Sequence, residues 1–246
     1  MPELECRSLD KHFGNLHVTR SLDLKVSTGR IHALIGPNGA GKTTALSQLS
    51  GELASDAGRV LLDGVDITGV DLPGRVDLGI CRSYQTSSPF ADFAVWENVA
   101  LALLAAREKR FRFFTRAAGD SERRRRALQL LDEVGLDADP SSPVTALDHG
   151  ASRQLEIAMV LATDPSILLL DEPMAGMAPG EARALAGLLS RLGEKHGILL
   201  VEHDMDVVFA VADQITVLFD GAIIATGAPQ EIRANPDVQS LYLKES

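Results

Sequence analysis

Short apolar runs alternate with longer segments of helical periodicity along the chain. Such alternation is typical of an α/β sheet with helices on its faces. The predicted strands are the apolar runs 30–36, 59–65, 78–84, 166–172, 197–203, 214–220 and 222–227, several of which are apolar throughout and so predicted to be fully buried. The predicted helices are 42–50, 96–106, 121–134, 151–163, 179–194 and 204–211.

The alternation is broken in two parts of the chain. Residues 1–35 and 57–70 have the pattern of antiparallel strands, whereas about 86–150 contain helices and loops and no convincing strand. No internal repeat and no low-complexity linker separates these parts. We therefore expect a single domain over 1–246, with a core formed by about 1–85 and 151–246 and a helical insertion at about 86–150.

The loop between the strand 30–36 and the helix 42–50 reads GPNGAGKTT and contains the pattern GxxxxGK[ST]. Glycines let backbone N–H groups surround phosphates, and the following helix adds its positive N-terminal end. Lys42 would supply a point charge for the β and γ phosphates, and Thr43 a hydroxyl for Mg²⁺. The core is therefore predicted to be a P-loop NTPase with a parallel sheet. Its predicted phosphate-binding residues are Gly36, Pro37, Asn38, Gly39, Ala40, Gly41, Lys42, Thr43 and Thr44.

Two carboxylates, Asp171 and Glu172, end the apolar strand 166–172. Ligands of an open α/β sheet collect at this end of the strands. A buried unpaired carboxylate is costly, which favours a metal ion or proton transfer over an idle ion pair. Asp171 is predicted to support Mg²⁺, commonly through a water, and Glu172 to act as the general base that polarises the attacking water.

Two further polar residues follow predicted strands. His203 ends the strand 197–203, which is predicted to lie parallel and adjacent to the Asp171 strand. We expect it to hydrogen-bond the γ-phosphate, although a lone histidine is more often structural. Gln85 follows the strand 78–84 and could reach the metal or the water.

Composition narrows the choice of partners. The formal net charge of −10 disfavours a protein that grips nucleic acid through an extended basic surface. No apolar run approaches the ~18 residues that span a bilayer, so contact with a membrane would go through partner subunits. The opening residues lack the pattern of a secretory signal. Cys6 and Cys81 have no metal or disulfide spacing, and we expect both to be buried.

These motifs together resemble the ATP-binding subunits of ABC transporters over nearly the whole chain. The Walker A motif is GPNGAGKT, the Q-loop carries Gln85, the signature region is LDHGA, the Walker B motif is ILLLDE and the switch histidine is His203. The stretches 153–179, 199–213 and 232–243 look most like the branch that serves branched-chain amino acids and related polar solutes.

The resemblance implies a site, partners and a location. Phe13 would stack on adenine with Val18 beside it, the alternative being that Phe13 is a core aromatic. Two ATPase subunits would sandwich two ATP molecules with Mg²⁺, each site pairing one chain's Walker A motif with the other chain's signature. The further partners would be transmembrane permease subunits and, indirectly, a solute-binding protein. The chain would lie peripherally on the cytoplasmic face of the inner membrane.

The signature departs from the family's usual LSGGQ, because the corresponding residues are Leu147, Asp148, His149, Gly150 and Ala151. A carboxylate at ~4 Å from a phosphate charge would cost about 4 kcal/mol at an effective dielectric of 20. Alternatively, Asp148 caps the helix that follows, where its charge also suits the helix dipole. We expect a retained docking helix with a weakened phosphate contact.

A second departure is Ala178, where many relatives place an aspartate. This favours an asymmetric pair with a different partner ATPase, although a homodimer remains possible. The leading function is an ATPase subunit that powers solute import. One rival is a soluble ABC-type ATPase of DNA repair or translation, but the chain has a single cassette and no long coiled-coil insertion or basic linker. The other is a degenerate regulatory subunit, which Asp148 favours and Glu172, Gln85 and His203 oppose.

Overall fold

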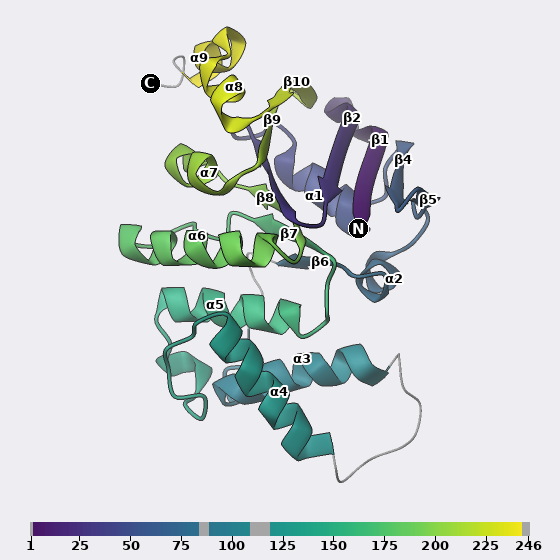
Figure 1. The fold of residues 1–246 in the computed structure, drawn as a ribbon. Coiled ribbons are helices and arrows are strands. Elements are labelled where there is room, and N and C mark those ends of the chain that lie inside the picture. Colours follow the sequence, from purple (N-terminus) through teal and green to yellow (C-terminus); the bar gives the residue numbers. More distant parts are fainter. Residues whose placement is uncertain (1, 84–88, 109–118, 243–246) are drawn as a thin grey trace.

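The structure, a computed structural model, describes residues 2–83, 89–108 and 119–242 (Figure 1). The strands are β1 (Glu3–Phe13), β2 (Leu16–Ser27), β3 (Arg30–Ile35), β4 (Ala57–Leu62), β5 (Val65–Asp66), β6 (Ile80–Ser83), β7 (Ile167–Asp171), β8 (Gly197–Val201), β9 (Gln214–Phe219) and β10 (Ala222–Gly227). The helices are α1 (Lys42–Ser50), α2 (Leu72–Asp77), α3 (Val95–Glu108), α4 (Gly119–Glu133), α5 (His149–Leu161), α6 (Pro179–Gly193), α7 (Met205–Val211), α8 (Pro229–Ala234) and α9 (Pro236–Tyr242), with a 3₁₀ turn η1 (Val144–Ala146).

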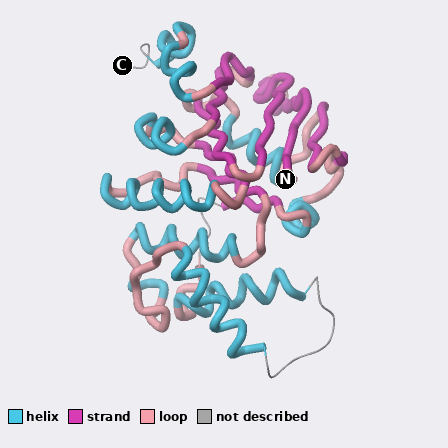
Figure 2. Tube along the Cα trace, viewed as in Figure 1, coloured by secondary structure: helices cyan, strands magenta, loops and turns pink. Residues whose placement is uncertain are grey.

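The strands form two sheets, as the sequence predicted. The four-stranded sheet has the order β2-β1-β4-β5 and is antiparallel. The six-stranded sheet has the order β10-β9-β3-β8-β7-β6 and is parallel except for its edge strand β10. Figure 2 shows the strands gathered on one side of the molecule and most of the helices on the other.

One strand differs from its prediction. We expected antiparallel pairing throughout 1–35, but β3 pairs in parallel with β8 and β9. Every residue of β3 after Arg30 is buried, which is typical of a central parallel strand covered on both faces. The other predicted strands and all six predicted helices are present. Helices α2, α8 and α9, each of six or seven residues, were not predicted.

Helix α1 fills the space between the two sheets. Its Leu46 and Leu49 pack in one buried cluster with Leu4 of β1, Leu34 of β3 and Leu169 of β7. Cys6 belongs to the same cluster, and both Cys6 and Cys81 are buried, as predicted. Because α1 begins directly after the loop 36–41, this packing fixes the loop relative to both sheets.

Helices α3, α4 and α5 pack together on one side of α6 (Figure 1). Their apolar faces share one core with the six-stranded sheet, in which Val99, Leu130 and Leu155 join Leu168 of β7. This helical unit consists of α3 and α4, which lie in the proposed insertion at about 86–150, and of α5, which follows it. In the part of the chain that the structure describes, no helix is long and apolar enough to cross a membrane.

Arg75 of α2 holds the C-terminal end of α1 in place. Its side chain is buried at 2% exposure, and this burial lowers the pKa of the guanidinium. The Nη1 atom donates to the carbonyl oxygens of Gln48 (2.6 Å) and Leu49 (2.7 Å). The remaining donors reach the carbonyl oxygens of Ile67, Thr68 and Val70. Arg75 thus satisfies carbonyl groups that the end of a helix leaves unpaired.

We predict that Arg75→Met lowers the free energy of unfolding by about 2–4 kcal/mol, because buried carbonyl oxygens lose their donors. Arg59→Met is the matched control, since the Arg59 side chain is 71% exposed and its loss should change stability by less than about 0.5 kcal/mol. Urea denaturation followed by circular dichroism measures both. Equal stability of the two variants would contradict this role of Arg75.

Candidate functional site

The loop 36–41 joins the carboxyl end of β3 to the N-terminus of α1. Gly36 and Gly41 have φ values of 153° and 102°. A Cβ atom on Gly36 would overlap the carbonyl oxygen of Leu218, and one on Gly41 would overlap that of Val18. Both glycines are therefore required, by their conformation and by the backbones of β9 and β2 that pass beside them.

Lys42 directs its ammonium group into this loop. Its Nζ donates to the carbonyl oxygens of Gly36 (2.6 Å) and Pro37 (2.9 Å), and the residue is 7% exposed. Thr43 is exposed and Thr44 half-buried in the first turn of α1. No side chain caps this helix, so its first N–H groups face outward. Backbone donors, a helix N-terminus and a lysine are the groups that bind phosphate.

Asp171 ends β7 with its side chain only 3% exposed. Its Oδ2 accepts a hydrogen bond of 2.7 Å from Nη2 of Arg82. The buried Oδ1 has no hydrogen-bond partner among the residues that the structure describes. A buried carboxylate oxygen of this kind needs a ligand. Oxygen atoms are what Mg²⁺ prefers, so Asp171 fits the predicted metal, with the Thr43 hydroxyl as a second oxygen.

Arg82 of β6 was not singled out from the sequence. Besides Asp171, its guanidinium contacts the Glu52 carboxylate and the Ser47 hydroxyl, both at 2.7 Å. Since β6 lies beside β7, this arginine ties the Asp171 carboxylate to α1 and the loop that follows it. A charged residue inside the buried strand ICRS was the available signal, because such a residue must find a partner.

Glu172 and His203 lie close together just beyond the carboxyl ends of β7 and β8. As predicted, β7 and β8 are parallel neighbours, and Asp171 is paired with Val201. Glu172 has a φ of 47° and its N–H donates to the Val201 carbonyl oxygen (2.9 Å). Nδ1 of His203 lies 3.9 Å from Oε1 of Glu172. The His203 side chain is 62% exposed, so its imidazole is accessible to a ligand.

Glu202 is a second residue that the sequence reading missed. It is 1% exposed, and its carboxylate accepts from the N–H groups of Met174 (2.9 Å) and His203 (3.2 Å). Burial raises the pKa of this carboxyl group. The hydrogen bond from Met174 joins the turn after β7 to the end of β8, and the one from His203 is local to the end of β8.

Phe13 ends β1, and Val18 lies in β2, the next strand of the same hairpin. Phe13 is 51% exposed, so the alternative that it is a core aromatic is wrong. Val18 is half-buried, and its carbonyl group is the one that Gly41 approaches. An exposed aromatic ring can stack on a nucleotide base. Gln85 lies outside the described residues.

The signature residues Leu147–Ala151 form the start of α5. Asp148 is its N-cap, and its Oδ1 accepts a hydrogen bond of 2.8 Å from the Ala151 N–H. The capping interpretation is therefore confirmed. Nε2 of His149 lies 3.2 Å from the Ala175 carbonyl oxygen, and Gly150 is buried against Glu181.

Known proteins share this arrangement. The family model described as ABC transporter matches residues 19–175. The chain is 38% identical to the high-affinity branched-chain amino acid transport ATP-binding protein BraF of Pseudomonas aeruginosa, covering 100% of this chain and 99% of that protein. It is 36% identical to LivG of Escherichia coli, of the same description, with the same coverage. The chain belongs to the ABC transporter family of ATP-binding proteins.

Further matches agree with this family. A second model, described as branched-chain amino acid ATP-binding cassette transporter, matches residues 222–243. The crystal structure of a nucleotide-free ATP-binding cassette from an ABC transporter superposes with a TM-score of 0.85 at 29% identity, covering 98% of this chain and 99% of that one. The ADP conformation of a cassette also gives a TM-score of 0.85, at 28% identity and 99% coverage of both chains. The predicted ABC ATPase fold and ATPase class are confirmed.

The cap on α5 yields a stability prediction. Asp148→Ala should lower the free energy of unfolding by about 1 kcal/mol, because the Ala151 N–H loses its acceptor. Asp148→Ser should change it by only a few tenths of a kcal/mol, roughly, because serine caps about as well as aspartate. Chemical denaturation of the two variants measures the difference. Loss of stability in both would mean that the carboxylate has a role beyond capping.

Proposed function

We propose that this chain is the ATP-hydrolysing subunit of an importer for branched-chain or related amino acids. One observation carries the proposal: Lys42, Asp171, Glu172 and His203 all lie at or beyond the carboxyl ends of β3, β7 and β8, which are adjacent in the sheet. Ligands bind at this edge of open α/β sheets. The choice of solute is supported by the names of the two relatives and by the match of residues 222–243.

The proposed roles follow from the contacts of each residue. Residues 36–44 bind the phosphates, with Lys42 on the β and γ groups, while Phe13 and Val18 hold the adenine. Thr43 and Asp171 hold Mg²⁺, with Gln85 as a further ligand. Mg²⁺, when bound, neutralises charge that develops on the transferring phosphoryl group.

Glu172 is the proposed general base. It accepts a proton from the water that attacks the γ-phosphorus. The bond between the γ-phosphorus and the oxygen that links it to the β-phosphate breaks, and ADP is the leaving group. His203 donates a hydrogen bond to a γ-phosphate oxygen. The separation of 3.9 Å between His203 Nδ1 and Glu172 Oε1 allows one water or phosphate oxygen to contact both side chains.

We propose that catalysis requires a second ATPase subunit. Leu147–Ala151 would face the nucleotide of that partner, and its signature would face the nucleotide bound here. Asp148 brings a carboxylate where the usual signature has a serine, and the N–H of Ala178 is bonded to Glu181 (2.9 Å) without an aspartate side chain at 178. Since this chain's own Walker residues are complete, a different partner ATPase is favoured over a second copy.

The remaining partners are proposed from the family. Transmembrane permease subunits would bind the chain, with the helical unit α3–α5 as the contact, and a solute-binding protein would act through them. The chain would then lie peripherally on the cytoplasmic face of the inner membrane. We propose no nucleic acid partner, because the net charge is −10.

We predict that Glu172→Gln lowers the rate of ATP hydrolysis by about 100-fold or more, the usual contribution of a general base, while ATP binding persists. Glu194→Gln, an exposed change at the end of α6, is the control and should hydrolyse ATP normally. Because the proposed catalysis requires a partner ATPase, hydrolysis is measured as phosphate release by the complex reassembled with that partner and the permease subunits, and a fluorescent ATP analogue measures binding. Normal hydrolysis by Glu172→Gln would exclude Glu172 as the base.

The same variant tests the dimer. Blocked hydrolysis should trap any closed pair, so light scattering with Mg-ATP reports whether two copies associate. We expect Glu172→Gln alone to stay monomeric, and the additional change Asp148→Ser to produce an ATP-dependent dimer. The reason is that Asp148→Ser removes the repulsion between the Asp148 carboxylate and a phosphate charge, which is about 4 kcal/mol at ~4 Å and an effective dielectric of 20. An ATP-dependent dimer of Glu172→Gln alone would show that the Asp148 signature binds phosphate.

A further inference from the structure

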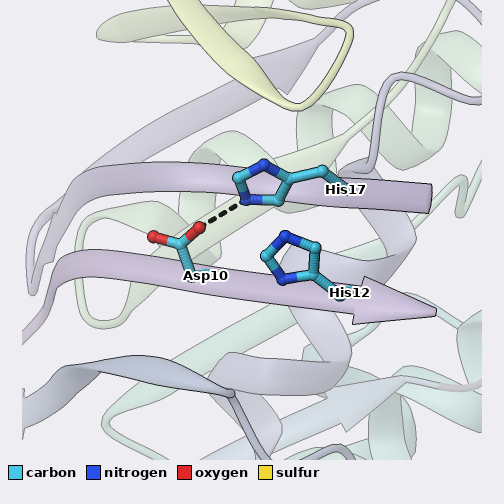
Figure 3. Close-up of side chains that lie close together, drawn as sticks. All are labelled: Asp10, His12 and His17. Carbon is cyan, nitrogen blue, oxygen red and sulfur yellow. Dashed lines mark hydrogen bonds and ion pairs between the residues drawn. The ribbon is translucent and has the colours of Figure 1, made fainter. Parts of the chain in front are cut away.

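A second group of ligand-type side chains lies on the β1–β2 hairpin. Asp10 and His12 project from β1 and His17 from β2, with the carboxylate beside the two rings (Figure 3). One potential ligand atom from each residue lies within 4.8 Å of the others. Among the residues that the structure describes, no other His, Cys, Asp and Glu side chains form such a group. None of the three has a role in the proposed ATPase site.

The register of the hairpin brings these residues together. His12 is paired directly with His17, and Asp10 precedes His12 by two positions, so that it lies on the same face of the strand. The imidazole rings are stacked, with centroids 3.9 Å apart and planes inclined by 14°. Residues 10–17 therefore form the pattern D-x-H-x₄-H within one tight hairpin.

Neighbouring groups orient the two side chains from β1. Oδ2 of Asp10 accepts from the N–H (3.1 Å) and hydroxyl (3.2 Å) of Ser21, which turns Oδ1 toward Nε2 of His17, its hydrogen-bond partner. Oδ2 of Asp56 lies 3.7 Å from Nδ1 of His12 and accepts the His12 N–H at 2.7 Å. A carboxylate is a usual partner for the ring nitrogen of a metal-binding histidine that does not contact the metal. With Asp56 beside Nδ1, the Nε2 atom of His12 is left as the ligand atom.

The charge of the group also suits a cation. Desolvation, the largest single effect, acts to raise the pKa of Asp10, but the hydrogen bonds from His17 and Ser21 outweigh it and leave this pKa below its usual value. Asp56 adds a second carboxylate, whose pKa is lowered mainly by its hydrogen bond from Lys11, and the Lys11 ammonium at 2.7 Å offsets its charge.

We propose that Asp10, His12 and His17 bind one late first-row divalent cation of the Zn²⁺ class. Imidazole nitrogens with a carboxylate oxygen suit Zn²⁺ and its neighbours, whereas Mg²⁺ prefers oxygen ligands alone. Around a tetrahedral ion with ligands at about 2.0–2.1 Å, ligand atoms lie roughly 3.3 Å apart. The rings must turn out of their stacked arrangement to direct both nitrogens at one ion, and exposures of 47% for His12 and 32% for His17 leave room for this. Water completes the coordination.

The test uses the full chain, freed of metal by a chelator and without nucleotide, at about pH 7.5, where unperturbed imidazole is mostly neutral. Equilibrium dialysis against Zn²⁺ alone, followed by metal analysis, should give one bound ion per chain. His12→Gln and His17→Gln should each weaken binding by about tenfold or more, because even outer partners of a metal contribute that much. Excess Mg²⁺ should not compete, which distinguishes this site from the one at Asp171.

His196→Gln is the matched control. His196 is half-buried and its Nδ1 lies 2.7 Å from the Pro165 carbonyl oxygen, outside the hairpin. It should bind Zn²⁺ like the unchanged chain.

Thermal unfolding gives a second readout. Zn²⁺ should raise the unfolding temperature of the unchanged chain and of His196→Gln, because an ion that binds the folded state stabilises it, and should not do so for the hairpin variants. Since His12 is exposed, His12→Gln remains informative even if His17→Gln is less stable without metal. Absence of Zn²⁺ binding, or equal binding by the double variant His12→Gln/His17→Gln, would overturn the proposal.

Discussion

The close passage of the loop 36–41 between two other backbones is the constraint on which the rest of the site depends. Gly41 meets the carbonyl group of Val18 in the antiparallel sheet, and Gly36 meets that of Leu218 in the six-stranded sheet. No side chain fits at either point. The loop therefore fixes the positions of the two sheets and of the start of α1 relative to one another. It also places the ammonium of Lys42 at a fixed position relative to the strand ends that carry Asp171 and His203.

Charged groups around this loop are tolerated in a buried environment because each has a defined partner or an evident ligand. Arg82 pairs with Asp171 across neighbouring strands and reaches Glu52 beyond α1. The other oxygen of Asp171 has no hydrogen-bond partner within residues 2–83, 89–108 and 119–242. A structural ion pair gains nothing from an unsatisfied buried oxygen, whereas a metal site requires one. The arginine thus holds the carboxylate in place, and the remaining oxygen supports the proposed Mg²⁺ site.

The features that were predicted correctly are those that depend on residues close together in the sequence. The apolar runs fixed the positions of the strands, and the spacing of Gly36, Gly41 and Lys42 specified the loop, since these features depend on neighbouring residues alone. The pairing of β3 was mispredicted because an apolar strand does not indicate its partners. Arg82 and Glu202 were missed for the same reason: the ion pair of Arg82 spans 89 positions of sequence, and the hydrogen bond of Glu202 to Met174 spans 28. The stacked histidines required the hairpin register, which also becomes visible only in the fold.

The Walker residues of this chain match the family's pattern, whereas its signature residues depart from it. The requirements of folding account for this difference. The Walker half depends on buried contacts, and a change at Gly41 or Asp171 would disturb the core as well as the site. The signature half is the exposed start of a helix, where aspartate and serine cap α5 about equally well. Folding therefore constrains the first half and leaves position 148 free to vary, so that only phosphate binding across an interface could select serine there. If the partner is always a different ATPase, the pair has two ATP sites, each formed by the Walker residues of one chain and the signature of the other. Selection for serine is then needed at only one of the two sites. This is consistent with complete Walker residues and an altered signature in the same chain.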